Sequence, residues 1–411
     1  MVARRPVAAL ATAVVVGVAG CAPAAPSPRP IASSVPSALP TPVAASIPSA
    51  TPAATPASEL MAELDVRSLD PQTTDAILAF ASDGRSILFS AGLSNDAAHE
   101  AAPDLWRIHA DAEDPEPEPE LVWRNPSRDH SIVRLAGDLG SAIFVEIPLD
   151  GSRSWNLWLI PQGAEEAILL DSHPGDEAVS SLVPSFSIQE STVAWTAFDV
   201  GAAGPVSQLL VAHGPEWRPS VLQERPAAEA ELWLPSFHAG RLAYSEIRYN
   251  ADRSTDTRGV YVLDLRSADE EPRRLDRSDR ATMPLLVGDT VLWKEADRGF
   301  SMFNWGTLWR SDTGGGNIGR LDTTPQDYVN YPSAGTRFIA WWGANAFEFG
   351  VYDLVEERPR LMERHAAGSQ TNVLRPHIAG DLLAWLHVEG EGPGSRAELR
   401  YAFMPPVRAP R

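Results

Sequence analysis

The residues that could perform chemistry are scattered along this 411-residue chain. Its nine histidines lie far apart, and no His-Glu-x-x-His pair occurs, the spacing that holds zinc on one helix face. There is no Gly-x-Ser-x-Gly turn, which would present a nucleophilic serine. The single cysteine, Cys21, excludes a thiolate cluster and an intramolecular disulfide. The sequence therefore predicts no catalytic residue, no metal and no cofactor.

A second set of residues suits recognition rather than catalysis. Aromatic and arginine side chains are the usual anchors of binding surfaces, and aromatic rings also stack on sugars. Several of them stand in or near polar segments that read as loops between apolar runs. The candidate binding residues are Trp155, Trp233, Tyr249, Trp305, Tyr331 and Arg248. The alternative is that about half of these aromatic residues pack beneath their own loops.

The elements that position these residues recur along the chain. An apolar run, a polar turn and a second apolar run that ends in an aromatic residue repeat at intervals of 44 to 55 residues. No segment of 58–404 keeps a helical period. Short strands in a repeat of this length are typical of a β-propeller. We therefore expect an all-β fold, a single propeller of seven four-stranded blades. The repeated aromatic residues are Phe89, Phe144, Trp195, Tyr244, Trp293, Trp341 and Trp385.

Prolines mark the first strand of five repeats. Pro184, Pro235, Pro284, Pro332 and Pro376 each precede the turn to the second strand, and we expect them to open the first strand.

Two repeats carry a more specific signature. The run Ala79 to Phe89, with Asp83-Gly84 at its turn, resembles the hairpin of TolB-type propeller repeats. Thr307 to Asp312, followed by Gly314 to Gly316, resembles the second half of the same repeat. This resemblance implies the propeller architecture, but the family performs many unrelated functions, so it implies little about activity.

The two ends of the chain are expected to close the ring. The last repeat lacks an outer strand, whereas Leu64 to Asp70 has the character of one. Pairing these segments would join the first and last repeats, and loop-closure entropy rises only slowly with length.

The N-terminus has the features of a signal peptide that directs export. Residues 1–20 combine a basic head with an apolar core of about twelve residues, shorter than the roughly 20 that span a bilayer. The ending Val18-Ala19-Gly20-Cys21 resembles the processing box of bacterial lipoproteins, which implies cleavage before Cys21 and its acylation. Residues 21–57 carry ten prolines and form an extended linker. Residues 58–404 are the propeller and 405–411 a C-terminal tail. An ordinary secretory leader is the alternative.

Charge limits the possible partners. The formal net charge of −20 argues against nucleic acid and against electrostatic docking on anionic lipid. Contact with a membrane is therefore expected through the lipid anchor only, in the bacterial cell envelope, outside the cytoplasm. We expect a monomer.

Three hypotheses about function remain open. Long loops link the second strand of each repeat to the third, and function concentrates on such loops. The first hypothesis is a non-catalytic module that binds a protein or a glycan on this loop face. The second is a lyase-like, carbohydrate-active enzyme, in which His130, His173 and His365 converge at the channel mouth and bind a metal. The third is an envelope-assembly scaffold.

Overall fold

The computed structural model describes most of the chain beyond residue 63. The described residues are 64–69, 77, 79–91, 104–110, 117–127, 129–175, 183–250, 256–267, 271–296, 306–321, 329–343, 348–364, 371–390 and 396–405. They belong to one compact unit that spans residues 57–391 and 395–411. The leader at 1–20, Cys21, the linker at 21–57 and all of the tail after Pro405 lie outside the described residues.

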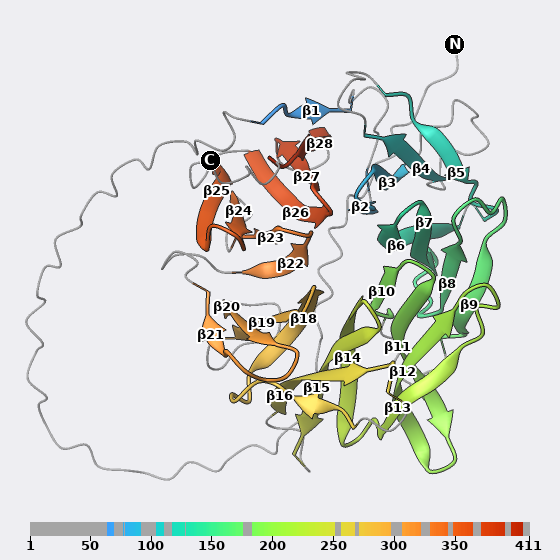
Figure 1. The fold of residues 1–411 in the computed structure, drawn as a ribbon. Helices are drawn as coiled ribbons and strands as arrows, with labels where there is room; N and C mark the ends of the chain where they lie inside the picture. The colour runs from blue at the N-terminus through green and yellow to red at the C-terminus, as the bar shows by residue number, and fades with distance from the viewer. Residues whose placement is uncertain are drawn as a thin grey trace, which may run out of the picture. The chain divides into compact units, whose positions relative to one another are not determined.

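Seven antiparallel sheets of four strands each form the blades, so the predicted all-β propeller is confirmed (Figure 1). In six blades the four strands are consecutive in the sequence. No helix among the described residues has the length and hydropathy to cross a membrane. The strands of blades 1 to 6, from the inside outward, are β2(Ala79–Ser82), β3(Ser86–Ala91), β4(Asp104–His109) and β5(Glu120–Trp123); β6(His130–Asp138), β7(Ser141–Pro148), β8(Trp155–Ile160) and β9(Ile168–His173); β10(Phe186–Gln189), β11(Thr192–Gly201), β12(Gly204–His213) and β13(Ser220–Pro226); β14(Ala230–His238), β15(Arg241–Tyr249), β16(Asp256–Asp264) and β17(Arg273–Arg274); β18(Ala281–Val287), β19(Thr290–Ala296), β20(Gly306–Asp312) and β21(Gly319–Arg320); and β22(Asn330–Ala334), β23(Phe338–Trp342), β24(Glu348–Asp353) and β25(Arg358–Arg364).

Blade 7 contains strands from both ends of the propeller. Its order is β26(Thr371–Ala379), β27(Leu382–Glu389), β28(Arg396–Phe403) and β1(Arg67–Ser68). Arg67 pairs with Tyr401, and the amide of Leu69 donates to the Leu399 carbonyl at 3.0 Å. The predicted closure of the ring is therefore confirmed.

The second strand of each blade supplies the core between blades. Its aromatic residues are Phe89, Phe144, Trp195, Tyr244, Trp293, Trp341 and Trp385, and each is at most 2% exposed. Burial on both faces explains why these strands are apolar throughout rather than alternating.

The prolines lie in a different place from the one that the sequence predicts. Pro184 precedes β10 by two residues, but the other four lie inside the first strands of blades 4 to 7, each at a break in register with the second strand. The residue before each of these four prolines has a positive φ between 45° and 54°. These are β-bulges, which turn a side chain away from its regular direction, and proline is tolerated there because a ladder hydrogen bond is already missing. The four bulges are Leu234-Pro235, Met283-Pro284, Tyr331-Pro332 and Arg375-Pro376.

At four junctions between blades, a first-strand side chain accepts a hydrogen bond from the backbone of the next blade. Ser187, Ser236 and Ser333 accept hydrogen bonds through Oγ from backbone amides of the following first strand, at 2.9 to 3.1 Å. In blade 7 the same position is His377, whose Nδ1 accepts from the Ser82 amide at 3.1 Å. His377 therefore links the last blade to the first. Burial lowers its pKa to about 4, which keeps the ring neutral and able to accept.

Candidate functional site

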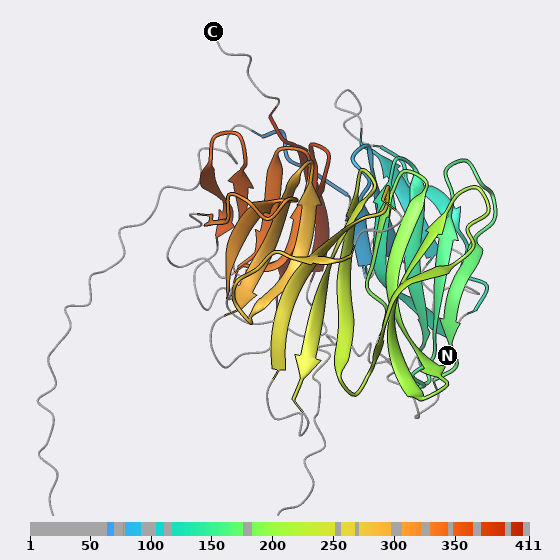
Figure 2. The same ribbon diagram turned by 60° about the horizontal axis from the view of Figure 1, so that its bottom comes forward.

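The two faces of the ring are built differently. Each first strand meets its second strand in a tight turn on one face, here the turn face, whereas the loops from second to third strands lie on the opposite loop face. Figure 2 shows the strands running between the two. On the turn face, Asp83 Oδ2 accepts from the Gly140 amide at 3.1 Å, and Gln189 Oε1 accepts from the Ala239 amide at 2.7 Å. A Cβ on Gly335 would lie 2.1 Å from the Gly380 carbonyl oxygen. The polar groups of these turns are thus used to hold neighbouring blades together.

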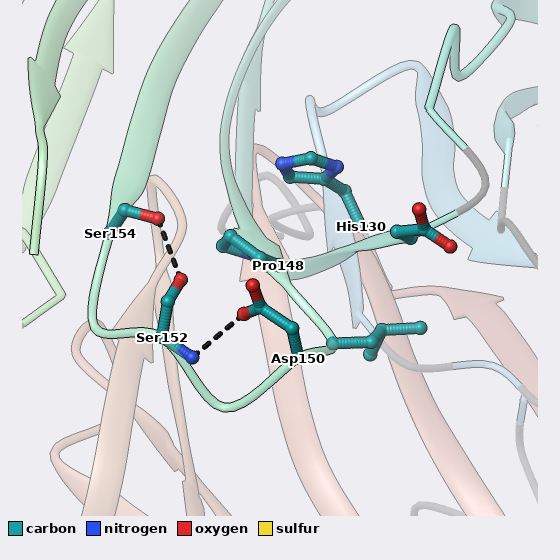
Figure 3. Close-up of a pocket in the computed structure, with 7 residues that line it drawn as sticks. His130, Pro148, Asp150, Ser152 and Ser154 are labelled. Atoms are coloured by element: carbon teal, nitrogen blue, oxygen red, sulfur yellow. Dashed lines mark hydrogen bonds between the residues drawn. The ribbon is translucent and has the colours of Figure 1, made fainter.

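The loop face carries a pocket at blade 2. It has a volume of about 470 Å³ and lies between the start of β6 and the loop that follows β7 (Figure 3). The Ser152 amide donates to Asp150 Oδ1 at 2.7 Å, and this bond lowers the pKa of the Asp150 carboxyl. A carboxylate, hydroxyls and an imidazole suit a hydroxyl-rich or peptide ligand, which needs both donors and acceptors. The lining residues are Asp129, His130, Pro148, Leu149, Asp150, Ser152 and Ser154.

One contact beside this pocket has the first elements of nucleophilic chemistry. Ser127 Oγ and His130 Nδ1 are hydrogen bonded, and the Ser127 amide donates to Asn125 Oδ1 at 2.9 Å. A nucleophile and base also need a third group that orients the base. Within the described part of the chain no carboxylate is hydrogen bonded to His130. The contact is accounted for as a local side-chain turn of the kind that serine forms.

Trp155 lies in the core rather than on a loop. It is the first residue of β8, is 2% exposed and stacks on His173 with ring centroids 5.9 Å apart. It therefore contributes to the packing of blade 2 and offers almost no surface to a ligand.

Blade 4 brings two of the candidate binding residues together. Trp233 and Tyr249 pack in one cluster with Ile247 at the loop-face end of β14 and β15. Trp233 is 9% exposed and Tyr249 is partly exposed, so Tyr249 offers more of this cluster to solvent. Arg248 points to the other face of the same sheet because neighbours in a strand alternate. There it pairs with the buried carboxylate of Glu246, which raises the pKa of the guanidinium.

The remaining candidates are separated from these. Tyr331 lies in an inner strand, at the β22 bulge, and is 48% exposed; its ring lies 6.2 Å from that of Trp342. Trp305 falls outside the described residues, as does Cys21.

The channel at the centre of the ring contains two arginines that the sequence reasoning missed. The innermost strands surround this channel (Figure 1). Arg134 of β6 and Arg375 of β26 act electrostatically on one another, and Arg134 and Arg375 both act on Tyr331. The three residues come from the inner strands of blades 2, 6 and 7. The signal in the sequence is a lone arginine inside an otherwise apolar first strand, as in Ile132-Val133-Arg134-Leu135.

The histidine set of the lyase-like alternative is not brought together among the described residues. His130 begins the inner strand β6, whereas His173 ends the outer strand β9 of the same blade. Two strands separate them, a distance of about 14 Å at the usual strand spacing. His365 is outside the described residues. Among the described residues, no group of three or more His, Cys, Asp or Glu side chains is placed to hold a metal ion.

No protein-family model matches the chain, and no curated protein matches it. Solved structures do match. The β-propeller domain of the Trilobed protease from Pyrococcus furiosus is 8% identical over 82% of this chain and 93% of that chain, with a TM-score of 0.54. An oligogalacturonate lyase in complex with manganese is 10% identical over 84% and 91%, with a TM-score of 0.50.

A prolyl endopeptidase structure also matches, at 12% identity and a TM-score of 0.51. The alignment covers 77% of this chain but only 46% of the endopeptidase chain, so this chain spans about half of that protein. At these identities the likeness shows the fold alone. It agrees with the propeller architecture that the TolB-type signature implies.

Proposed function

We propose that this chain is an extracytoplasmic binding module, anchored to the bacterial envelope through Cys21, that holds a protein or glycan ligand on the loop face of its propeller. The observation that supports this proposal best is the contrast between the two faces. The turn face uses polar groups to join neighbouring blades, and its pocket beside Arg241 and Asp264 has a volume of about 210 Å³, whereas the loop face offers the blade 2 pocket of about 470 Å³ and the partly exposed Tyr249. Ligands bind where a rigid scaffold presents polar groups that are not already used in bonds between its own elements.

The chemistry of the loop face favours recognition over reaction. Asp129 is exposed, and Asp150 owes its lowered pKa to a neighbouring amide rather than to burial. A general acid or base near neutral pH usually has its pKa shifted by an enclosed environment. Open hydroxyls and carboxylates such as Ser152, Ser154 and Asp150 instead make reversible hydrogen bonds.

The anchor is tested separately from the binding surface. Cys21→Ser should leave the chain uncleaved at this site or release it from the membrane, because the thiol that would be acylated is gone. Detergent-phase partitioning and labelling with a fatty-acid probe give the readout. A membrane-bound, lipid-labelled Cys21→Ser protein would contradict the proposed anchor.

The ligand is sought with the purified full chain on a glycan array and in pull-downs from envelope extracts. Hits are then measured by titration against Tyr249→Ala and Asp150→Ala, with Asp289→Ala on the turn face as the matched control. We expect at least one loop-face variant to bind about tenfold or more weakly at unchanged thermal stability, since few residues carry most binding energy. If only the control variant loses affinity, the proposed loop-face site is wrong.

A further inference from the structure

The lining of the blade 2 pocket carries negative charge and no positive side chain. Asp129 and Asp150 both line it, and the Asp150 carboxylate points inward, toward Pro148 (Figure 3). No arginine or lysine belongs to the lining, and within the described part of the chain neither carboxylate is paired with one. The only lysine of the chain, Lys294, is buried in blade 5. Charge complementarity therefore favours a cationic ligand group at this pocket.

A buried carboxylate lies one step deeper in the same blade. Glu146 is 3% exposed and stands two residues before Pro148 in β7. Because side chains alternate along a strand, Glu146 and Pro148 point to the same face, about 7 Å apart. Glu146 Oε2 accepts from the Trp158 indole at 3.0 Å, whereas its buried Oε1 has no hydrogen-bond partner. A buried carboxylate without an ion pair is unfavourable, and a cation bound in the pocket would reduce this cost.

Apolar surface adjoins these charged groups. Leu149, in the lining, is 58% exposed, and Val200, near the tip of the β11–β12 hairpin on the next blade, is 62% exposed. No phenylalanine, tyrosine or tryptophan lines the pocket as described, and Trp155, which could have stacked on a sugar, is in the core. A lysine side chain suits such a place, because its carbon stem packs on apolar surface while its ammonium stays with polar groups.

We propose that the loop-face ligand is a basic polypeptide segment and that the blade 2 pocket binds one of its lysine side chains. Asp129 and Asp150 accept hydrogen bonds from the ammonium, and the carbon stem packs on Leu149. The ammonium has three donors, and the Ser154 hydroxyl offers a further acceptor. This inference rests on the loop-face function proposed above and specifies the class of its ligand.

The state of Asp150 favours lysine over arginine. Its Oδ1 already accepts from the Ser152 amide at 2.7 Å. The two parallel bonds that a guanidinium prefers need both carboxylate oxygens, whereas an ammonium acts as a point charge. The formal net charge of −20 also favours encounter with a basic partner.

The test measures binding of a labelled, blocked pentalysine peptide to the purified full chain by fluorescence anisotropy at constant ionic strength. A pentaglutamine peptide and a glucosamine tetrasaccharide serve as competitors. We expect saturable binding of the lysine peptide and weaker competition by both others. Asp150→Asn should weaken binding about tenfold, since charge-assisted hydrogen bonds are the stronger class. Its amide oxygen can still accept from Ser152, so the loop is retained.

Two control variants separate the pocket from the overall charge. Glu166→Gln removes the same charge from an exposed residue in the turn between β8 and β9, at the other end of blade 2, and should change affinity by about twofold at most. Arg153→Gln removes an exposed positive charge from the pocket loop and should leave binding equal or tighter. Equal weakening by Asp150→Asn and Glu166→Gln would mean attraction by net charge alone and would overturn the lysine site.

The remaining outcomes distinguish this inference from the loop-face function itself. Tighter binding of the glucosamine tetrasaccharide than of the lysine peptide would overturn the polypeptide ligand. If the array or the pull-down yields a loop-face ligand without positive charge, the lysine site is wrong and the loop-face function stands. If no loop-face variant weakens binding of any ligand, both are wrong.

Discussion

Replacing His377 with serine should remove a specific part of the acid sensitivity of this propeller. His377 accepts a hydrogen bond from the Ser82 amide across the junction between the last and first blades. Serine performs the same task at positions 187, 236 and 333, with hydrogen bonds of 2.9 to 3.1 Å. His377→Ser therefore keeps the link between blades while removing a group that titrates.

The magnitude follows from the lowered pKa of His377. The folded value is about 4, against 6.5 for an ordinary histidine, so between these values the unfolded chain binds more protons. Lowering the pH through this window therefore favours unfolding, and the stability contributed by neutral His377 is fully present only above about pH 7. Linkage gives a loss of about 2 kcal/mol by pH 5, rising to about 3 kcal/mol below the folded pKa.

The assay is urea unfolding of the parent and of His377→Ser at pH 7.5 and pH 5. Many carboxylates titrate as well, but they are common to both proteins, so the difference between the two pH dependences isolates His377. The parent should lose about 2 kcal/mol more than the variant. Equal losses would show that His377 is not held neutral at this junction, and the reasoning about the junction would fail.

Three further changes to the chain are expected to alter its stability. Deleting residues 58–70 should lower the melting temperature clearly, because β1 is lost from blade 7 and burial of Leu69 alone contributes about 2 kcal/mol. Deleting residues 22–57 should lower it little, and equal melting temperatures for the two deletions would contradict the closure of the ring by β1. Trp155→Ala should lower the free energy of unfolding in urea by about 3–5 kcal/mol, because it leaves a cavity in the core. A change near zero would show that Trp155 is not a core residue. Arg337→Met should cost about 3–5 kcal/mol by the same assay, since it leaves the buried Asp353 carboxylate unpaired; a neutral result would show that this pair adds nothing.

The sequence predicts the fold well because the propeller repeats one physical pattern. Each second strand is buried on both faces, so its residues must be apolar and its aromatic residue fills the space between blades. Trp293 and Trp385 mark this position as clearly in the sequence as in the structure. The closure by β1 was also predictable, because a blade with three strands leaves an edge unpaired.

The candidate site was harder to predict because strand boundaries decide which residues are exposed. Trp155 stands beside a polar segment and reads as a loop residue, but Trp155, Leu157 and Leu159 alternate as the buried face of β8. That alternation is the signal that would have placed it correctly. Boundaries between loop and strand are where such patterns are weakest.

The direction of the side chains in the channel depends on β-bulges, which the hydrophobic periodicity of the sequence does not reveal. A bulge adds one residue and shifts the alternation of inward and outward side chains, so the direction of Tyr331 and Arg375 cannot be counted from the strand ends. The approach of Arg134 to Tyr331 also requires the ring to close, because the two residues belong to blades that are distant in the sequence.

The central claim is that ligand is held on the loop face, and a hydrogen-exchange footprint tests it most directly. The full chain is compared with and without the ligand found on the array or in the pull-down. We predict slowed exchange in residues 148–155 and in the ends of β14 and β15 around Ala230 and Tyr249. Turn-face amides such as those of Gly140 and Ala239, which already bond to neighbouring blades, should remain unchanged. Protection confined to the turn face would contradict the account.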